Sequence, residues 1–477
     1  MNRLLIANRG EIARRIIRTA RAMGIETVAI YSDADTASLH VREADISYRL
    51  EGLTPRQTYL DLDRVMEAVH ATGADALHPG YGFLSENPEI ARRCAAEGIT
   101  FVGPTPDAIE HLGSKTNARK LAIDADVPIM PGTTSAITSI DEAKATAEKI
   151  GYPVLLKAAA GGGGKGMRVV EEPGKLEESL RMAQGEALTA FNSDEVFLEK
   201  YVTGPRHIEL QVIADHHGNV AVLGERECSI QRRHQKVIEE SPSVAVDDAL
   251  RARMFASAER LVKAAGYTNA GTLEFLLDDT GNFYFLEVNT RLQVEHPVTE
   301  MVTGLDLVEL QIRVARGEHL PITTESVRRR GHAIECRICA EDVYQNFMPS
   351  IGTVRELQEP SGPNVRVDSS LYDGMQVTLY YDPMVAKLIV WAPTRAEAID
   401  AMLAALDGYH IAGISTTIPF CSFVLASSSF RDGHFSTNYV REHWTDPKPA
   451  LSDELLELAV AAAIRAHCRI EERIAGL

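Results

Sequence analysis

The side chains most capable of chemistry lie within residues 272–297, TLEFLLDDTGNFYFLEVNTRLQVEHP. Two apolar runs, Thr272–Leu277 and Phe283–Val288, flank residues 278–282, whose Asp-Asp-Thr-Gly-Asn sequence is typical of a turn. Apolar runs joined by such a turn indicate a β-hairpin. We therefore expect the polar residues of this stretch to be displayed on a two-stranded ribbon.

Two carboxylates of the hairpin are predicted to face each other. A turn centred between positions 280 and 281 places Glu274 opposite Glu287, and Phe275 opposite Leu286 on the other side of the ribbon. Directly opposed carboxylates lie ~5 Å apart, and at an effective dielectric of ~20 they repel by ~3 kcal/mol. A divalent cation bound through oxygen is the simplest counter-charge, so the pair predicts a metal site.

The polar series continues beyond the hairpin at every second position. Alternate side chains of an extended segment point the same way, so one face is predicted to carry Glu287, Asn289, Arg291, Gln293 and Glu295. The solvated face of an edge strand is the simpler interpretation. It is disfavoured because the row directly follows the apolar FYFLEV run, and we interpret the row as a site.

Composition sets the broad class of the protein. The 477 residues allow two to four domains, each with its own core. The net charge of −18 argues against non-specific binding to nucleic acid or an anionic membrane. Six irregularly spaced cysteines do not make a disulfide framework, and neither a signal peptide nor an apolar run of about 20 residues is found. We expect a soluble, cytoplasmic protein.

The first 113 residues alternate strand and helix patterns. Strands are predicted near 4–7, 27–31, 76–77 and 99–102, and helices near 11–23, 60–71 and 89–97. Repeated βα units imply a parallel, doubly wound sheet. The first turn lacks GxGxxG, so ordinary dinucleotide binding is not supported. Residues 78–87, HPGYGFLSEN, follow a strand where such sheets bind ligands, although a merely tight loop is an equal alternative.

Two further segments are candidates for phosphate binding. A glycine run, residues 161–166, lies between strands predicted at 154–157 and 167–170, and backbone N–H groups of such a run can wrap phosphates. Its cationic flanks favour this interpretation over a mobile linker. Residues 229–236, SIQRRHQK, are dense in cations and are also interpreted as phosphate-binding. The pair His216-His217 is predicted to be an exposed turn.

The C-terminal part shows strand and turn patterns. Residues 332–339 alternate as a strand, and turns through Gly374 predict an antiparallel β-rich domain closed by a helix at 395–406. Cys336 and Cys339 form a lone CxxC whose side chains are predicted to point to opposite faces, which disfavours zinc or redox chemistry. A helix predicted at 455–474 is expected to pack on its own domain, with docking to a partner as the alternative.

Six motifs occur in a fixed order along the chain: IANRGEIA (6–13), HPGYGFLSEN (78–87), KAAAGGGGKGMR (157–168), RRHQK (232–236), EVNTRLQVEHPVTE (287–300) and ECRICAED (335–342). Together they resemble biotin carboxylase, a member of the ATP-grasp family. The resemblance covers residues 1 to about 445. It implies an α/β and α+β architecture with four parts: a Rossmann-like N-terminal domain (1–113), an ATP-grasp domain (114–330) with a mobile lid at about 131–203, a β-rich C-terminal domain (331–446), and a linker with a tail helix (447–477).

The resemblance also implies roles for individual residues. ATP is expected at Lys115, Lys157, Gly162, Gly163, Gly164, Glu199, Lys200, Val202, His207, Gln231, His234 and Lys236. Magnesium or manganese is expected at Glu274, Glu287 and Asn289, in agreement with the hairpin argument. Bicarbonate is expected at Arg291, Gln293, Val294 and Glu295, and biotin at Tyr81, Gly82 and Arg337. The catalytic set is expected to be Glu295, Arg291, Arg337 and Lys236, with Glu295 as the base.

The implied chemistry uses ATP and bicarbonate as substrates and biotin as the acceptor. Glu295 deprotonates bicarbonate, which attacks the γ-phosphate of ATP to give carboxyphosphate and ADP. Carboxyphosphate breaks down to CO2 and phosphate, the phosphate takes the N1′ proton of biotin, and Arg337 stabilises the ureido oxygen. The chain contains no Ala-Met-Lys-Met attachment segment. Biotin is therefore expected on a separate carrier protein, or the sequence is truncated.

The expected partners are a second copy of the chain, as a homodimer or larger oligomer, a biotin carboxyl carrier protein and a carboxyltransferase subunit. The alternative enzyme is another ATP-grasp carboxylate ligase, which would not be expected to carry the same set of motifs. The non-enzyme alternative is an inactive nucleotide-binding subunit, which the intact charged positions disfavour. The sequence does not name the final carboxyl acceptor, which could be acetyl-CoA, propionyl-CoA, pyruvate or another compound.

Overall fold

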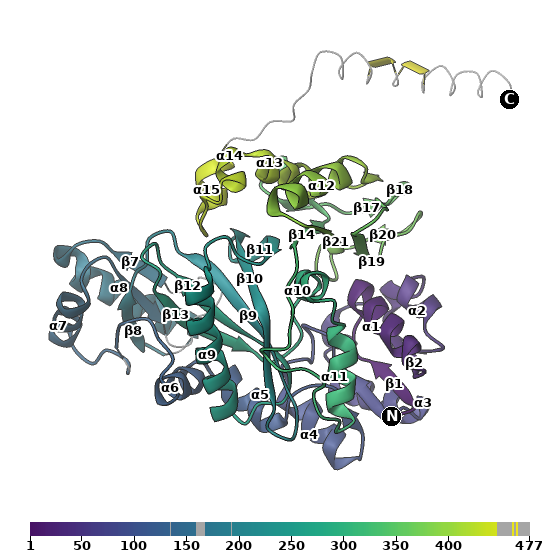
Figure 1. Cartoon of the computed structure of the whole chain (residues 1–477), viewed down its shortest axis with the longest axis horizontal. Helices are drawn as coiled ribbons and strands as arrows, with labels where there is room; N and C mark the ends of the chain where they lie inside the picture. The colour runs from purple at the N-terminus through teal and green to yellow at the C-terminus, as the bar shows by residue number, and fades with distance from the viewer. Residues whose placement is uncertain (134, 159–166, 192, 446–459, 462–463, 466–477) are drawn as a thin grey trace.

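The computed structural model describes residues 1–133, 135–158, 167–191, 193–445, 460–461 and 464–465. Figure 1 shows an N-terminal α/β region, a long sheet through the centre, a small lobe beside it and a group of helices at the C-terminal end. No described helix is long and apolar enough to cross a membrane. The glycine run at 161–166 and most of the predicted tail helix lie outside the described residues.

The N-terminal region is built on a five-stranded parallel sheet in the order β3-β2-β1-β4-β5. Its strands are β1 (Arg3–Ile6), β2 (Glu26–Tyr31), β3 (Ile46–Arg49), β4 (Ala76–His78) and β5 (Thr100–Phe101). Its helices are α1 (Gly10–Ala22), α2 (Leu39–Glu43), α3 (Leu62–Thr72), α4 (Pro88–Ala96) and α5 (Pro106–Gly113). The predicted parallel sheet is confirmed, and the loop at 78–87 follows β4 as expected.

One antiparallel sheet of eight strands carries the candidate site. Its order is β13-β12-β9-β10-β11-β14-β21-β19. The strands are β9 (Arg206–Ala214), β10 (Val220–Arg232), β11 (Gln235–Ser241), β12 (Asn269–Leu277), β13 (Phe283–Asn289), β14 (His332–Cys339), β19 (Val365–Ser369) and β21 (Met384–Ala392). Because β11 pairs with β14, the C-terminal strands continue the central sheet. Residues far apart in sequence therefore meet on one face.

The small lobe has a sheet and a core of its own. The sheet, in the order β7-β6-β8, contains β6 (Val154–Ala158), β7 (Met167–Val170) and β8 (Val196–Lys200). Helices α7 (Ile140–Ile150) and α8 (Leu176–Phe191) pack on it, and α6 (Lys115–Asp124) precedes the lobe and packs against β13. Buried Leu156 and Leu198 lie in a hydrophobic cluster separate from that of the central sheet.

The remaining elements cover the central sheet and complete the C-terminal part. The helices are α9 (Asp248–Ala264), α10 (His296–Thr303), α11 (Leu307–Ala315), α12 (Arg395–Asp407), α13 (Ile418–Ala426), α14 (Ser428–Arg431) and α15 (Tyr439–His443). The short strands are β15 (Glu341–Asp342), β16 (Met348–Pro349), β17 (Gly352–Thr353), β18 (Glu356–Gln358), β20 (Gln376–Val377) and β22 (His410–Ala412). Helix α10 packs against β10, β11, β14 and β21, so the residues just before it reach the middle of the sheet.

The predicted hairpin is present, with one error of register. Glu274 pairs with Glu287 as predicted, but Phe275 pairs with Phe285 and not with Leu286. The strands are irregular between Glu274 and Phe275, and a β-bulge of this kind places two residues of one strand against one of its partner. Leu286, the residue passed over by the pairing, is 36% exposed.

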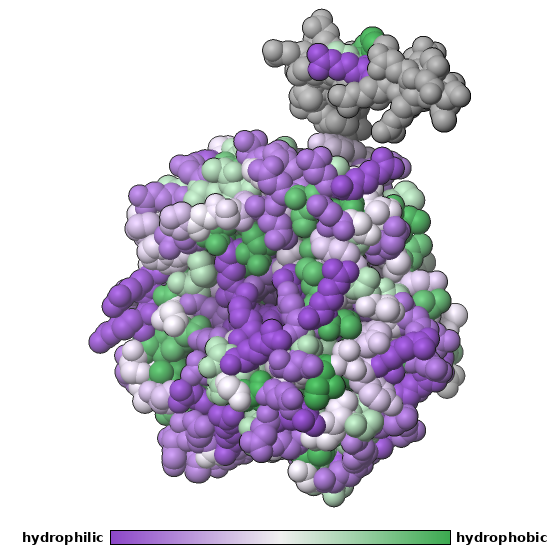
Figure 2. All heavy atoms as spheres, turned by 90° about the vertical axis from the view of Figure 1, so that its right-hand side faces the viewer, coloured by the Kyte–Doolittle hydropathy of each residue, from purple (hydrophilic) through white to green (hydrophobic). Residues whose placement is uncertain are grey.

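The face of the molecule drawn in Figure 2 is mainly polar. Figure 2 shows hydrophilic side chains over most of one face and around a hollow near its centre, with hydrophobic side chains in small separate patches. The turn at His216-His217 is exposed, as predicted.

Gly331, immediately before β14, provides a test of this architecture. Its φ is +66°, and a Cβ there would lie 2.5 Å from the Trp391 ring and press on the carbonyl oxygen of Ala392. Strain at positive φ and overpacking each cost roughly 1–2 kcal/mol, so Gly331→Ala should lower the free energy of unfolding by about 3 kcal/mol. Gly266→Ala is the matched control because its φ is +55° with open space around it. The difference between their urea midpoints measures the steric part, and equal midpoints would contradict the packing described.

Candidate active site

Lys236 on β11 lies at the centre of a buried charge cluster. Its ammonium donates to Glu209 on β9, to Glu274 on β12 at 2.9 Å and to Glu295 at 2.6 Å. A tight turn at Arg233 and His234, both with positive φ, reverses the chain between β10 and β11 and starts β11 one residue before the lysine. Strand β10 lies between β11 and β9, so the long lysine side chain reaches across it. Three acids from separate segments therefore share one cation.

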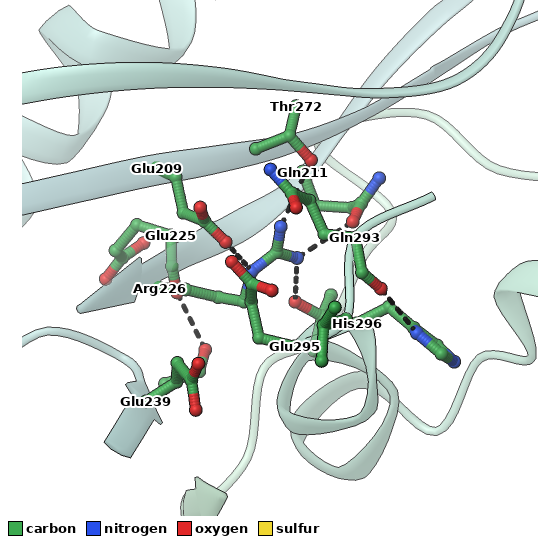
Figure 3. A network of polar contacts seen from close by, with 12 residues as sticks. Glu209, Gln211, Glu225, Arg226, Glu239, Thr272, Gln293, Glu295 and His296 are labelled. Carbon is green, nitrogen blue, oxygen red and sulfur yellow. Dashed lines mark hydrogen bonds and ion pairs between the residues drawn. The ribbon is translucent and has the colours of Figure 1, made fainter. Parts of the chain in front are cut away.

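Arg226 on β10 is a second cation in the same cluster and is fully buried (Figure 3). Its guanidinium donates to Glu209, to Gln211 at 2.8 Å, to Thr299 at 2.9 Å and to Thr272 at 3.1 Å. A buried charge is tolerated only when it is paired and its hydrogen-bonding groups are satisfied. The four partners meet this condition and fix β9, β10, β12 and α10 relative to one another.

Arg337 on β14 approaches Glu295 from the other side. Its Nε donates to Glu239 on β11 at 2.6 Å, and its terminal nitrogen donates to Glu295 at 2.9 Å. Glu295 has no exposed surface and lies directly before α10, whose first turn contains Pro297. Glu295 thus receives hydrogen bonds from Lys236 and Arg337 at its two oxygens.

The electrostatic balance keeps the central acids ionised. Burial alone would raise the pKa of Glu295, but Lys236, Arg337 and Arg226 outweigh it and hold the pKa of this carboxyl well below its usual value. Burial likewise opposes ionisation of Glu274, and Lys236 with His207 lowers its pKa below the ordinary range. Both groups are therefore carboxylates at neutral pH.

The polar row after the hairpin is present, but not as one extended strand. The predicted continuous alternation is wrong, because β13 ends at Asn289 and Glu295 already caps α10. Hydrogen bonds link the row instead: Arg291 donates to Asn289 at 3.1 Å and to Gln293 at 2.8 Å, and Gln293 donates to Glu274 at 3.1 Å. The side chains predicted to share one face thus remain neighbours.

The hairpin residues fit a hard divalent cation by ligand type. Glu274 and Glu287 are register partners, and Asn289 lies against Glu274, its amide nitrogen donating at 2.9 Å. Two carboxylates and an amide are the oxygen ligands that Mg²⁺ and Mn²⁺ prefer. Glu287 is partly exposed and lies 3.6 Å from the ammonium of Lys115.

A second set of potential ligands overlaps the hairpin set at Glu274. The ligand atoms of His207, Glu209 and Glu274 lie within 4.8 Å of one another, and His207 Nε2 is 3.0 Å from Glu274. Glu209 in this set is already bound to Arg226 and Lys236. The hairpin set, which is all oxygen and includes the more accessible Glu287, is the better match to magnesium.

Other residues expected at ATP lie around the small lobe and the β10–β11 turn. Lys157 lies 3.4 Å from Glu199, which also accepts from Arg119 at 2.9 Å. The ammonium of Lys200 donates to the carbonyl oxygens of Gly151 and Tyr152, each at 3.0 Å. The remaining positions are Val202, half-buried after β8; Gln231, bonded to the Cys228 carbonyl at 2.7 Å; and His234, exposed in the turn. Gly162, Gly163 and Gly164 lie outside the described residues.

Two residues expected at biotin, Tyr81 and Arg337, lie beside a further buried cation, Lys387 on β21. Tyr81 donates to Glu11, and the Lys387 ammonium lies 5.8 Å from the centre of the Tyr81 ring. Lys387 also donates to the carbonyl oxygen of Val294 at 2.8 Å, which connects it to the polar row. Gly82 has φ +65° with open space around it.

Several residues of the site were missed by sequence reasoning: Glu209, Arg226, Glu239, Arg119 and Lys387. Glu209 and Lys387 each interrupt an apolar strand, IELQVIA and MVAKLIVWA respectively. A charge inside an apolar strand is rarely buried without a partner, and this signal could have identified both. The pairing of each charge depends on the strand order and could not have been read from the sequence.

The fold and the site together define an ATP-grasp enzyme. Residues 114–323 match the family described as carbamoyl-phosphate synthase L chain, ATP binding domain. Residues 1–109 and 335–442 match the N-terminal and C-terminal domains of biotin carboxylase. The chain is 49% identical over 444 residues to biotin carboxylase 1 of Bacillus subtilis, covering 93% of this chain and 99% of that one. The chain therefore belongs to the biotin carboxylase family, and the predicted fold class and family are confirmed.

Two other relatives show the range of this similarity. The propionyl-CoA carboxylase alpha chain of Ruegeria pomeroyi is 49% identical over 492 residues, covering 99% of this chain and 72% of that one. The biotin carboxylase domain dimer of Hydrogenobacter thermophilus 2-oxoglutarate carboxylase, in complex with MgADP, ADP and bicarbonate, superposes with a TM-score of 0.86 at 47% identity, covering 93% of this chain and 97% of that one.

Lys236→Met tests the shared cation. Removing it leaves three buried acids without their common partner, which should lower the free energy of unfolding by about 3 kcal/mol at pH 7. Because the pKa values of Glu274 and Glu295 are depressed in the folded state, their stabilising effect is present above their ordinary pKa of 4.5 and is lost as the pH falls below it. Unfolding midpoints at pH 7 and pH 4 should therefore differ less in Lys236→Met than in the wild type. Lys236→Arg, which keeps the charge, is the control, and parallel losses in wild type and Lys236→Met would contradict the assignment.

Proposed function

We propose that this chain is the biotin carboxylase component of a biotin-dependent carboxylase. It uses ATP and bicarbonate to carboxylate biotin through carboxyphosphate. The observation that carries the proposal is the position of Glu295, a buried carboxylate bonded to Lys236 on one side and to Arg337 on the other. Membership of the family supports the same reaction.

Glu295 acts as the base toward bicarbonate, which Arg291, Gln293 and the backbone of Val294 hold beside it. In the arrangement described, two cations make Glu295 a weak base. The terminal phosphates of ATP attract the ammonium of Lys236, which loosens its bond to Glu295. The proton affinity of Glu295 then rises when both substrates are in place, as general-base catalysis requires.

The remaining residues bind and orient the nucleotide. Lys115, Lys157, Lys200, His207, Gln231 and His234 surround the position proposed for ATP, with Glu199 and Val202 toward the adenosine. A divalent cation bound by Glu274, Glu287 and Asn289 would neutralise the negative charge that develops on the phosphates. The glycines at 162–164 belong to the segment proposed to cover the phosphates and exclude water.

Arg337 directs its guanidinium to the ureido oxygen of biotin, near Tyr81 and Gly82. Negative charge develops on that oxygen when N1′ loses its proton, and a fixed cation in a buried site stabilises it. Arg337 is already held by Glu239, so little reorganisation is needed when biotin arrives.

The carboxyl acceptor is chosen by another component. Relatives named for propionyl-CoA and for 2-oxoglutarate match this chain at 49% and 47% identity over nearly its whole length. The proposed partners are therefore a biotin carrier protein and a carboxyltransferase, and the dimeric relative supports a homodimer. A biotinylated protein should co-purify with the chain, and sedimentation should give twice its mass; a monomer that captures no biotinylated protein would contradict this part of the proposal.

Glu295→Gln tests the base. The amide keeps the shape but cannot accept the proton, so bicarbonate- and biotin-dependent ATP cleavage should fall by about 10²–10⁴-fold, while ATP binding changes by about threefold or less. The control is Glu225→Gln, which alters a fully buried acid on β10 that bonds to Arg251. Wild-type turnover in Glu295→Gln would show that the base is elsewhere.

Arg337→Ala separates the two halves of the reaction. Carboxylation of free biotin should fall by about 10²-fold, whereas bicarbonate-dependent ATP cleavage without biotin should fall by about tenfold or less. Arg395→Ala is the control because Arg395 also binds a buried acid of β11, Glu240, at 2.8 Å. Equal losses in both assays would show that Arg337 has no specific role in the biotin step. If ATP cleavage by the wild type did not depend on biotin, the chain would be a different ATP-grasp ligase.

A further inference from the structure

Behind Arg337 lie two acids that the reaction does not use. Glu239 on β11 and Glu335 on β14 are register partners on adjacent antiparallel strands, and neither has any exposed surface. Directly opposed side chains have Cβ atoms about 5 Å apart. Two carboxylates are therefore brought together in the interior, and Arg337 separates them from the proposed position of biotin.

Most of the carboxylate oxygens of this pair accept no hydrogen bond from the described residues. One oxygen of Glu239 accepts from Arg337 Nε at 2.6 Å. Within the described part of the chain, Glu239 Oε2 and both oxygens of Glu335 have no hydrogen-bond partner. An ionised carboxylate that is buried without a donor is strongly disfavoured. A protonated Glu335, in contrast, can donate its O–H to Glu239 Oε2 and satisfy the opposing atom.

The neighbouring cations are already engaged. Lys387 on β21 donates to the Val294 carbonyl at 2.8 Å and lies 3.3 Å from Glu11 on α1. Arg337 is shared between Glu239 and Glu295. Helix α10 packs over this face, and Glu295 at its start adds a negative charge. His296 adds no charge, because burial, together with Lys387 and two arginines, holds the pKa of His296 well below its usual value. Acids therefore outnumber the free positive charges around Glu335.

We propose that Glu239 and Glu335 hold one proton between them, and that this proton sets the positive charge that Arg337 presents to biotin. Glu239 and Glu335 are then positioning residues, since neither touches a substrate. With the proton in place, Glu239 is the only charged member of the pair and anchors Arg337 together with Glu295. Without it, two opposed negative charges face the guanidinium and weaken its field at the ureido oxygen. The second part of the proposal rests on the proposed role of Arg337.

The titration of the pair supports this arrangement. Burial raises the pKa of Glu335 well above its usual value, with Lys387 and Arg337 opposing the shift and Glu239 and Glu295 adding to it. Burial also raises the pKa of Glu239 to about 7, although Arg337 opposes it. The pair therefore still holds a proton at neutral pH and loses it as the pH rises further.

Infrared difference spectra of the unliganded full chain test the proton directly. At pH 7 the wild type should show the carbonyl band of protonated carboxylic acids, and Glu335→Gln should lose the component of that band that belongs to the shared proton. The matched control is Glu240→Gln on the opposite face of β11, where an acid paired with His332 and Arg395 is ionised and contributes no such band. A band that persists unchanged in both Glu335→Gln and Glu239→Gln would overturn the proposal.

The pH profile tests the consequence for biotin. The amide of Glu335→Gln donates permanently, so the alkaline decline of kcat/KM for free biotin should move upward by about one pH unit relative to wild type. Glu335→Leu, which cannot donate, should lower kcat/KM for biotin by about tenfold with KM for ATP changed less than about twofold. An unshifted profile in Glu335→Gln, or equal loss in Gln and Leu variants, would mean that the residue only fills space.

The two measurements separate this inference from the proposed function. If that component of the band disappears in Glu335→Gln but the wild type does not carboxylate biotin, the shared proton stands and the proposed function fails. If biotin is carboxylated and the band is insensitive to both substitutions, the proposed function stands and the shared proton is refuted.

Discussion

The ammonium of Lys236, shared by three acids, is the interaction on which the rest of the site depends. Glu209, Glu274 and Glu295 come from β9, β12 and the start of α10, and each is almost fully buried. Removing three carboxylates from water is costly unless cations are fixed among them. The positions of the strands are therefore tied to the charges. Strand β11 must lie where its lysine can reach the acids of β9 and β12, and the fully buried Arg226 on β10, between β9 and β11, must pair with Glu209.

Local sequence was sufficient to predict the hairpin and the opposed pair Glu274 and Glu287. The pairing of the two acids was correct although the assumed turn was not, because a bulge compensated for the misplaced centre. Phe275 lies beyond the bulge and was consequently paired with the wrong residue. Turn residues indicate that a hairpin forms, but a bulge is fixed by packing on both faces of the ribbon, which a single strand pattern does not contain.

The polar row after Asn289 shows a different limit. Alternation predicted one shared face, and the side chains do remain together, but hydrogen bonds among Arg291, Gln293 and Glu274 hold them after the strand has ended. The parallel N-terminal sheet was predictable because βα units repeat locally. The pairing of β11 with β14 was not, because its two strands are about 90 residues apart and only the assembled sheet brings Glu239 beside Glu335. The partners of Arg226 and Lys387 could not be predicted for the same reason, although the charge of Lys387 within an apolar strand was a local signal.

The two cations on Glu295 connect the two halves of the proposed reaction. Lys236 lies on the side where the nucleotide is proposed to bind, and Arg337 on the side proposed for biotin, and both donate to the same carboxylate. When Glu295 accepts a proton it loses its charge, so its hold on both cations weakens at once. Lys236 is then freer to follow the phosphate, and Arg337 is freer to turn toward the ureido oxygen. In the proposed reaction, the proton taken from bicarbonate prepares the site for the acceptor, and this coupling needs no movement of the strands, because Glu209 still anchors Lys236 and Glu239 still anchors Arg337.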